Sequence, residues 1–356
     1  MRRRVLFVLP KLVAGGSEKV LRTVASNLDR GRFEVHLAVL GDSTIDDRAC
    51  LAPHIQIHKL AALRVRFAGI KLLRLVWKLR PQVVLAAGGP TGVVAASIRK
   101  FLPSGTRVIL RQGTMPAASV VHQKQWERYA FAWSQRSVDC VICQSNSMAD
   151  EVTRGAPVKR ERVRVIYNPV VRGKNANAGR SDREDKLRFL AVGRLAPEKR
   201  LELVIRAFAI LKRKHSNATL TIVGDGPCRD WLEELATVEG ISAAVEFTGF
   251  QEDPTAWMLH STALVMASEY EGLPNAVLEA LAIGLPVVAC DCPGGIREIA
   301  ETTTRLTLVE EATPAALARA MEETALRSAM QESPSDAFWQ RFGMESTLKQ
   351  YEQLLS

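Results

Sequence analysis

Short apolar runs alternate with longer segments of helical periodicity along the whole chain. In the first half the apolar runs are nearly continuous, as at residues 5–9, and a segment such as 17–28 places its apolar residues three or four apart. Runs of this kind predict strands buried on both faces of a parallel sheet, with helices as crossovers. The strands predicted in the first half are 5–9, 35–40, 82–86, 106–110, 139–143 and 162–167.

A polar segment interrupts this pattern near the middle of the chain. Residues 172–185 are almost free of large apolar side chains and contain glycine, which is typical of a linker between domains. The alternation then restarts, and the strands predicted after it are 187–192, 218–223, 244–248, 263–267 and 286–289. We therefore expect an α/β protein of two doubly wound domains, with ligands beyond the carboxyl ends of the strands and in the cleft between domains.

The densest chemical signal lies in the second predicted domain, after the strand at 263–267. Glu271 is followed by the turn Gly272-Leu273-Pro274-Asn275, and Glu279 lies one turn into the next predicted helix, which Asn275 is expected to cap. Two carboxylates placed in this way can accept hydrogen bonds from sugar hydroxyls, and the helix N-terminus suits a phosphate. The alternative is a surface loop with two solvated glutamates.

Four other segments follow predicted strands in the same manner. They are Ala14-Gly15-Gly16-Ser17-Glu18, Ile166-Tyr167-Asn168-Pro169, Val192 to Arg200 (Val-Gly-Arg-Leu-Ala-Pro-Glu-Lys-Arg), and Ile222-Val223-Gly224-Asp225-Gly226-Pro227. Together with Glu271 to Pro286, this ordered set resembles the signature of retaining glycosyltransferases of family four. The resemblance covers nearly the whole chain. It implies the GT-B fold, in which two Rossmann-like doubly wound domains face each other across a cleft.

The resemblance also implies domain bounds and site residues. The N-terminal acceptor-binding domain would span 1–170, the linker 171–186, the nucleotide-sugar-binding domain 187–335, and a C-terminal helix at 336–356 would cross back to the first domain. Arg194 and Lys199 would grip the donor diphosphate, Glu279 would bind the ribose, and Glu271 would contact the donor sugar and stabilise its transition state. The remaining donor-binding residues that the resemblance implies are Gly15, Gly16, Gly272, Leu273, Pro274 and Asn275.

The chain departs from the family pattern after the predicted strand at 106–110. Many members carry a histidine in this turn, whereas this sequence has Arg111-Gln112-Gly113-Thr114. A retaining mechanism in which the leaving phosphate takes the acceptor proton needs no such base. Arg111 would then bind an acidic acceptor such as a lipid pyrophosphate, or else be a structural arginine.

The charge is distributed unevenly. Residues 1–168 hold 28 Lys and Arg against 11 Asp and Glu, a net of +17, and residues 169–356 hold 20 against 27, a net of −7. No acidic residue occurs from 48 to 126. In the predicted helix 64–80, the side chains of Arg64, Lys71, Arg74 and Lys78 fall within about 80° of one another. An anionic membrane surface is the favoured partner of this helix, and a core-packed helix with a basic outer face is the alternative.

Metal and membrane-spanning signals are weak. The sequence has no Asp-x-Asp motif, and Cys140-x-x-Cys143 lacks a second pair at zinc spacing, so we expect no metal and no cofactor. The run at 83–98 is too short and too rich in glycine to span a bilayer, and the apolar start ends at Pro10, short of a signal peptide. These features predict a cytoplasmic protein peripherally associated with the inner face of the cell membrane.

The expected function is transfer of a sugar from a nucleotide sugar, with UDP as the expected nucleotide, to a lipid-linked saccharide in surface-glycan assembly. Alternatives are a nucleotide-sugar-binding pseudo-enzyme subunit of a glycan assembly complex and a GT-B sugar epimerase or phosphorylase. The basic first half also allows nucleic-acid binding, which predicts salt-sensitive binding to duplex DNA; we do not expect it.

Overall fold

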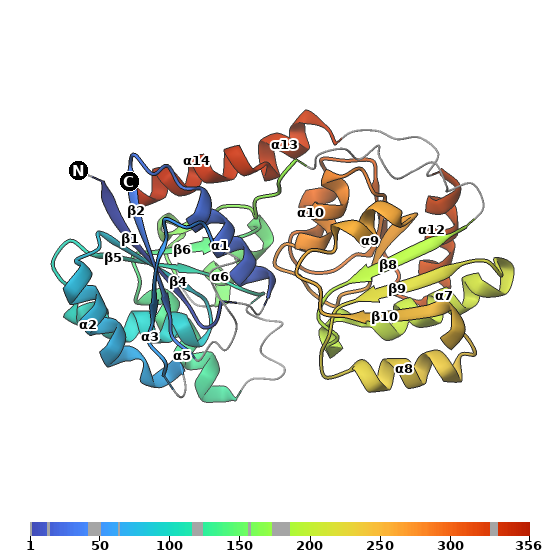
Figure 1. Ribbon diagram of the computed structural model, residues 1–356, viewed down its shortest axis with the longest axis horizontal. Coiled ribbons are helices and arrows are strands. Elements are labelled where there is room, and N and C mark those ends of the chain that lie inside the picture. Colours follow the sequence, from blue (N-terminus) through green and yellow to red (C-terminus); the bar gives the residue numbers. More distant parts are fainter. Residues whose placement is uncertain are drawn as a thin grey trace. The chain divides into compact units, whose positions relative to one another are not determined.

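The computed structural model describes residues 2–12, 15–41, 51–62, 65–115, 124–155, 158–172, 186–327 and 334–356. The chain divides into two compact units (Figure 1). Unit 1 comprises Met1–Pro169 and Met344–Ser356, and unit 2 comprises Val170–Gly343. Each unit contains one parallel sheet with helices on both of its faces, as the alternating pattern predicts.

Unit 1 is built on a seven-stranded sheet of order β3-β2-β1-β4-β5-β6-β7. Its strands are β1 (Arg3–Leu9), β2 (Phe33–Val39), β3 (Gln56–Lys59), β4 (Val83–Ala87), β5 (Arg107–Arg111), β6 (Cys140–Cys143) and β7 (Val163–Val165). Its helices are α1 (Gly16–Asn27), α2 (Gly69–Leu79), α3 (Pro90–Ile98), α5 (Gln125–Arg136), α6 (Asn146–Gly155) and α14 (Met344–Leu355), with 3-10 turns η1 (Val65–Phe67), η2 (Arg99–Phe101) and η4 (Arg160–Arg162). All pairs are parallel, so every carboxyl end lies at one edge.

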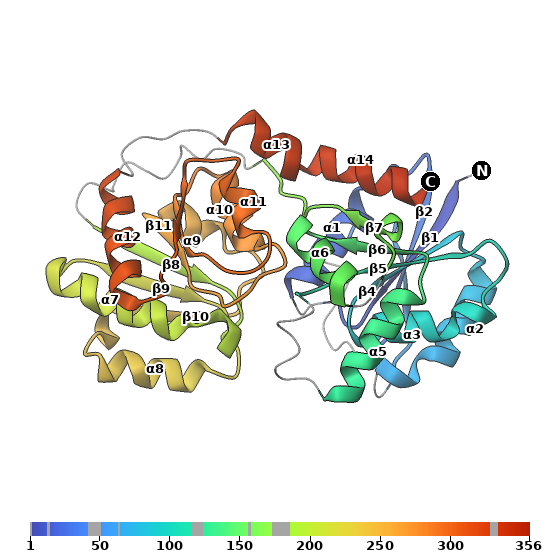
Figure 2. The ribbon, with the colours of Figure 1, turned by 180° about the vertical axis from the view of Figure 1, so that it is seen from behind.

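Different helices cover the two faces of this sheet. Alternate residues of the strands, such as Phe7 and Leu37, form one core with α1 and with Tyr351 and Leu355 of α14. On the opposite face α3 packs closely, because a Cβ added at Gly92 would lie 2.4 Å from Leu110 Cδ1. Helices α2 and α5 lie on either side of α3 and complete this second layer (Figure 2).

Unit 2 is built on a six-stranded parallel sheet of order β10-β9-β8-β11-β12-β13. Its strands are β8 (Arg188–Val192), β9 (Thr219–Val223), β10 (Val245–Gly249), β11 (Ala263–Met266), β12 (Val287–Cys290) and β13 (Leu306–Val309). Its helices are α7 (Leu201–Lys214), α8 (Arg229–Val238), α9 (Thr255–His260), α10 (Asn275–Ala282), α11 (Ile296–Ala300), α12 (Pro314–Arg327) and α13 (Asp336–Phe342), with η5 (Pro197–Lys199) and η6 (Ser242–Ala244).

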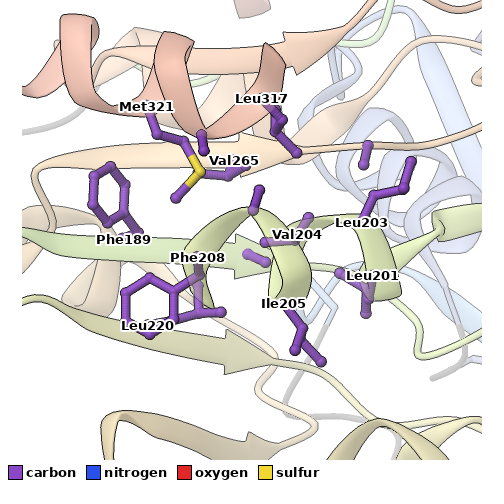
Figure 3. Close-up of a cluster of buried hydrophobic side chains, with 14 of the residues drawn as sticks. Phe189, Leu201, Leu203, Val204, Ile205, Phe208, Leu220, Val265, Leu317 and Met321 are labelled. Atoms are coloured by element: carbon purple, nitrogen blue, oxygen red, sulfur yellow. The ribbon is translucent and has the colours of Figure 1, made fainter. Parts of the chain in front are cut away.

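The core of unit 2 lies where α7 and α12 pack on the sheet. Val204 and Phe208 are fully buried on the face that α7 turns toward the sheet, where Phe189 of β8 lies. Leu317 and Met321 of α12 enter the same cluster (Figure 3). Burial of each side chain of this size stabilises the folded unit by about 1.5–3 kcal/mol. The cluster therefore fixes α7 and α12 on the sheet whose turns carry the candidate site.

Several expected elements differ from the observed ones. The single helix expected near the C-terminus is two helices, because the chain leaves α13 at Gly343 in extended backbone and restarts as α14. The predicted helix 64–80 is the turn η1 followed by α2, and Arg64 lies outside the described residues. The edge strands β3 and β13 were not predicted, since both are short and β3 is partly polar. Most of the linker expected at 171–186 lies outside the described residues as well.

None of the described helices is long and apolar enough to cross a bilayer.

Candidate active site in unit 2

The turns that follow β8 and β9 are joined through close backbone contacts. Gly193 N–H donates to the carbonyl of Val223 at 3.0 Å, and Leu195 N–H donates to Asp225 at 2.9 Å. A Cβ added at Gly224 would lie 1.9 Å from the carbonyl oxygen of Gly193, so only glycine allows these turns to meet. The two turns therefore form one continuous rim at the carboxyl edge of the sheet.

The turn after β8 carries two of the expected donor-binding cations. Arg194 pairs with Glu198, four residues later, at the start of η5. Burial raises the pKa of Glu198, but the hydrogen bond from Arg194 and the charge of Lys199 outweigh it, and the pKa falls below its usual value. The Glu198 carboxylate thus stays ionised at neutral pH and holds the Arg194 guanidinium in place.

Lys199 forms an ion pair with Glu271. The turns that carry them follow β8 and β11, which end at the same edge of the parallel sheet. Lys199 Nζ donates to Glu271 Oε1 at 2.5 Å, and Ser268 Oγ donates to the same oxygen at 2.8 Å. The side chains of Lys199 and Glu271 are 25% and 14% exposed. Because both donors bind Oε1, the carboxylate is held in one orientation.

The loop that carries Glu271 is fixed by the loop after β12. Glu271 N–H donates to the carbonyl of Pro293 at 3.0 Å, and Gly295 N–H donates to Gly272 at 3.1 Å. Gly294 has φ of 122°, and a Cβ there would lie 1.5 Å from the carbonyl oxygen of Glu271. This contact requires glycine at position 294, so the position of Glu271 depends on a residue far from it in the chain.

Helix α10 begins directly after this loop. Its N-cap is Pro274, with no side-chain capping bond, so the expected cap at Asn275 is wrong by one residue: Asn275 is the first residue of the helix. Leu273 is buried and anchors the turn. Glu279 lies in the second turn of α10, as its spacing from Asn275 predicts. In unit 2 the expected residues therefore lie on the turns after β8 and β11 and on α10, and the turn after β12 supports the second of these turns.

Gly15 and Gly16 belong to unit 1, where they begin α1. Gly15 is the N-cap in extended backbone, with φ of −165°, and no side chain caps the helix. A Cβ at Gly15 would meet only the end of the Glu18 side chain, at 3.1 Å. The backbone N–H groups of this helix start lie at the carboxyl edge of the unit 1 sheet, which is a suitable position for an anion.

Arg111 ends β5 and lies inside unit 1. It is 1% exposed, and its guanidinium donates to Ser17 Oγ at 2.8 Å and to Asn168 Oδ1 at 2.6 Å. The hydroxyl of the buried Tyr351 in α14 has its pKa raised by burial, an effect that the Arg111 cation opposes. Two of its guanidinium nitrogens therefore bond inside the unit, which favours the structural alternative. Contact of Arg111 with an acidic acceptor stays a prediction.

The expected membrane-facing cations of α2 differ in their contacts. Arg74 and Lys78 are exposed, whereas Lys71 Nζ donates to the backbone carbonyls of Leu60 at 2.8 Å and Ala61 at 3.1 Å. Lys71 therefore fastens the loop before α2 as well as carrying charge. The exposed side of the helix also contains Ile70 and Trp77.

The cysteines have the character of core residues. Burial raises the pKa of Cys143 and of Cys292 to about 12, so neither is a thiolate at neutral pH. Among the described residues there is no cluster of three or more histidines, cysteines or carboxylates suited to a metal ion.

Three residues of the site were not expected from the sequence. Ser268 orients Glu271, and Glu198 orients Arg194. Gly294 supports the loop that carries Glu271. Glu198 stands at i+4 from Arg194 in the sequence, a spacing that could have indicated the pair. Ser268 lies only three residues from Glu271, in a loop without regular spacing, whereas Gly294 lies 23 residues away and is brought to Glu271 by the fold.

Comparisons with known proteins agree with this arrangement. The family model Glycosyltransferase Family 4 matches residues 14–172, and the model Glycosyl transferases group 1 matches residues 174–337. An uncharacterized glycosyltransferase of Methanocaldococcus jannaschii is 40% identical over 116 residues, which are 33% of this chain and 29% of that protein. The chain thus matches less than a third of the length of that relative.

A longer match exists to a Campylobacter jejuni enzyme, N-acetylgalactosamine-N,N'-diacetylbacillosaminyl-diphospho-undecaprenol 4-alpha-N-acetylgalactosaminyltransferase. It is 26% identical over 84% of this chain and 83% of that enzyme. Among solved structures, Anabaena HepE in complex with UDP and glucose has a TM-score of 0.81 and 21% identity, covering 99% of both chains. At this identity the likeness shows the fold, two parallel sheets with flanking helices in the GT-B arrangement.

Proposed function

We propose that this chain, which belongs to the GT-B glycosyltransferases, is a retaining enzyme that transfers a sugar from a UDP-sugar to a lipid-linked saccharide. The observation that carries the proposal is the joint placement of Lys199, Glu271 and Ser268 beside the Arg194–Glu198 pair. Two cations and one oriented carboxylate on neighbouring turns suit a substrate that combines a diphosphate with a sugar.

The chemistry follows from these charges. In a retaining transfer on one face of the sugar, the bond between the anomeric carbon and the β-phosphate oxygen breaks while the acceptor hydroxyl bonds to the same carbon. The acceptor proton passes to the leaving phosphate, so no protein base is needed. Arg194 and Lys199 would stabilise the negative charge that develops on the diphosphate, and Glu271 would stabilise the positive charge on the sugar.

The nucleotide would be held by α10. Glu279 lies in its second turn, where its carboxylate can accept hydrogen bonds from ribose hydroxyls, and the α10 N-terminus favours the diphosphate. UDP is the proposed nucleotide because HepE, a structural neighbour, holds UDP in its crystal structure. These contacts use side chains and backbone of unit 2, without a metal ion.

The acceptor proposal rests on unit 1 and on one relative. The Campylobacter jejuni relative is named for an undecaprenol diphosphate-linked acceptor. The net charge of +17 over residues 1–168 suits a lipid pyrophosphate and an anionic membrane surface. We therefore place the enzyme peripherally at the inner face of the cell membrane, with Arg74 and Lys78 of α2 toward anionic headgroups.

The first experiment is a ligand-binding test of the donor site. Isothermal titration and thermal shift with UDP, GDP, ADP and dTDP sugars should give binding for the UDP class alone. Ligand at 100 times Kd should add about 2.7 kcal/mol to the free energy of unfolding. Lys199→Ala and Glu279→Ala should each weaken UDP-sugar binding at least tenfold.

Lys214→Ala is the matched control, because Lys214 also pairs with a glutamate, Glu322 at 3.0 Å, but on the far end of α7. This variant should bind UDP-sugars as the wild type does. Binding without any transfer to lipid-linked saccharides in a membrane extract would favour the pseudo-enzyme subunit. Failure of every nucleotide sugar to bind would overturn the proposal.

A further inference from the structure

The exposed apolar side chains of unit 1 gather on one of its two helical layers. Among the described residues of unit 1, all the large exposed apolar side chains lie on η1, α2, η2 and α5: they are Phe67, Ile70, Trp77, Phe101, Trp126, Tyr129 and Trp133. The layer on the opposite face, formed by α1 and α14, carries none of them. Exposed apolar surface concentrated in this way is typical of a site that binds a protein, a membrane or a ligand.

Helix α5 contributes three aromatic side chains to this layer. Trp126, Tyr129 and Trp133 are 58%, 65% and 43% exposed. At 100° per residue they fall within about 60° of one another, so they form one stripe along the helix. The buried residues of α5, Ser134 and Gln135, lie on the other side of the helix. The stripe therefore faces away from the protein along most of the length of α5.

The helix α2 presents a different surface. Trp77 Nε1 donates to the carbonyl of Phe101 at 2.9 Å, and the Arg80 guanidinium lies 4.1 Å from the centre of the Trp77 ring. This tryptophan is thus held against the protein, while Arg74 and Lys78 are exposed beside it. α2 offers exposed charge together with Ile70, whereas the exposed surface of α5 is mainly aromatic, and both helices flank α3 in the same layer (Figure 2).

Exposed cations accompany the aromatic stripe on the same helix. Lys124, Arg128 and Arg136 are exposed on or next to α5. The one carboxylate in the helix, Glu127, accepts a hydrogen bond from the Lys124 backbone N–H at 3.1 Å and so serves the N-terminus of the helix. Tryptophan and tyrosine are enriched where an apolar interior meets polar headgroups, and nearby cations favour anionic lipid.

We propose that the aromatic stripe of α5 inserts into the interfacial region of an anionic bilayer and is the apolar anchor of unit 1. The inference rests on the membrane partner in the proposed function and goes further by assigning the anchor to a different helix from the cations of α2. Binding then has two separable parts, an electrostatic part that salt weakens and an apolar part that salt leaves in place.

The test measures partition of the full chain onto anionic vesicles, which contain phosphatidylglycerol and phosphatidylcholine, and onto neutral vesicles of phosphatidylcholine alone. Both are measured at 0.1 M and 0.5 M NaCl. The stripe variant carries Trp126→Ser, Tyr129→Ser and Trp133→Ser, and the charge variant carries Arg74→Gln and Lys78→Gln. The stripe variant should lose at least about tenfold in partition at both salt concentrations. The charge variant should lose binding mainly at 0.1 M.

Trp231→Ser is the matched control, because Trp231 is an exposed tryptophan, 48% accessible, on α8 of unit 2. It should bind vesicles as the wild type does. Each variant is first checked for unchanged melting temperature and UDP affinity, which separates loss of the anchor from misfolding and from failure of the donor site.

A stripe variant that partitions like the wild type at both salt concentrations would overturn the inference. If that variant also bound a lipid-free saccharide acceptor more weakly, the stripe would be a sugar-binding platform instead. Binding by the wild type to neutral and anionic vesicles alike would remove the role assigned to the accompanying cations.

Discussion

The two units share one construction but place different chemistry at the carboxyl edges of their sheets. In unit 2 the edge carries paired charges: Lys199 with Glu271, and Arg194 with Glu198. In unit 1 the same edge carries Arg111, a buried cation whose two hydrogen-bond acceptors are the neutral side chains of Ser17 and Asn168. The doubly wound fold therefore fixes where a ligand can bind, and the residues of the turns decide what kind.

This difference separates two tasks. In the proposed site of unit 2, the paired charges would exchange their present partners for groups of the substrate. In unit 1 the buried cation bonds internally, and the proposed membrane binding uses surface residues of α2 and α5 instead. Substitutions at the two edges should therefore fail in different ways.

The largest effect is expected for Gly294→Ala in unit 2. The new Cβ would lie 1.5 Å from the Glu271 carbonyl oxygen at a φ of 122°, so the loop must move. We expect a loss of about 3 kcal/mol or more in the free energy of unfolding, and loss of UDP-sugar binding. Urea denaturation and calorimetry measure both.

Gly240→Ala is the control for this substitution. Gly240 also has a positive φ, 70°, but a Cβ there meets no atom within 4 Å. This variant should lose only about 1 kcal/mol and keep its ligand binding. Equal losses in the two variants would show that backbone strain, and not the contact with Glu271, is what matters.

The corresponding substitution in unit 1 is Arg111→Met. It removes the hydrogen bonds that Arg111 donates to Ser17 Oγ and Asn168 Oδ1, and we expect a loss of about 2–4 kcal/mol in the free energy of unfolding with little change in UDP-sugar affinity. Arg32→Met, which breaks an exposed pair with Glu352, should lose only about 0–1 kcal/mol. A large fall in UDP-sugar affinity with a small stability loss would contradict the structural role given to Arg111.

A smaller and more selective effect is expected for Ser268→Ala. Glu271 Oε1 would keep Lys199 as a donor and lose the serine. Transfer should slow about fivefold, equivalent to about 1 kcal/mol. Ser261→Ala removes a buried hydroxyl that donates to Trp257 in the same unit; it should lose similar stability without slowing transfer. If both variants slow transfer equally, Ser268 has no orienting role.

The smallest effect concerns pH and unit 1. Burial lowers the pKa of His58, with help from His36, whose Nδ1 lies 3.1 Å from His58 Nε2, and from Lys78. Below the ordinary histidine pKa of 6.5, the unfolded chain binds a proton that the folded chain does not, so stability falls as the pH drops. Urea denaturation at pH 8 and pH 5.5 should show a smaller drop for His58→Gln than for the wild type. An identical drop in both proteins would refute this assignment.

Much of the fold could be predicted because the interior strands are almost continuously apolar. Strand β4 is buried along its length and β1 from Val5 onward, and these apolar runs leave little choice of structure. The edge strand β3 has the sequence Gln-Ile-His-Lys with a mostly unburied pattern, and no hydrophobic run indicates it. The break at Gly343 was also missed, since α13 and α14 together give one helical periodicity.

The site could be predicted only where its residues are close in sequence or resemble a family motif. Glu271 and Glu279 follow from one segment, and Lys199 from another. The burial of Arg111 could not be predicted, because it depends on Asn168 and Tyr351, which approach it from segments 57 and 240 residues away. Burial of a charged side chain is decided by the packing of distant elements, and a single sequence does not contain that information locally.

Helix α14 has a consequence for the order in which the chain is made. Tyr351 and Leu355 complete the core of unit 1, and Arg107 donates to the carbonyl of Leu354 at 2.8 Å. Unit 2 is encoded between the two parts of unit 1. During synthesis, all of unit 2 is therefore translated before unit 1 is complete. Unit 1 cannot complete its core until α14 has left the ribosome. The surface proposed to bind membrane would then mature last, after the donor-binding unit.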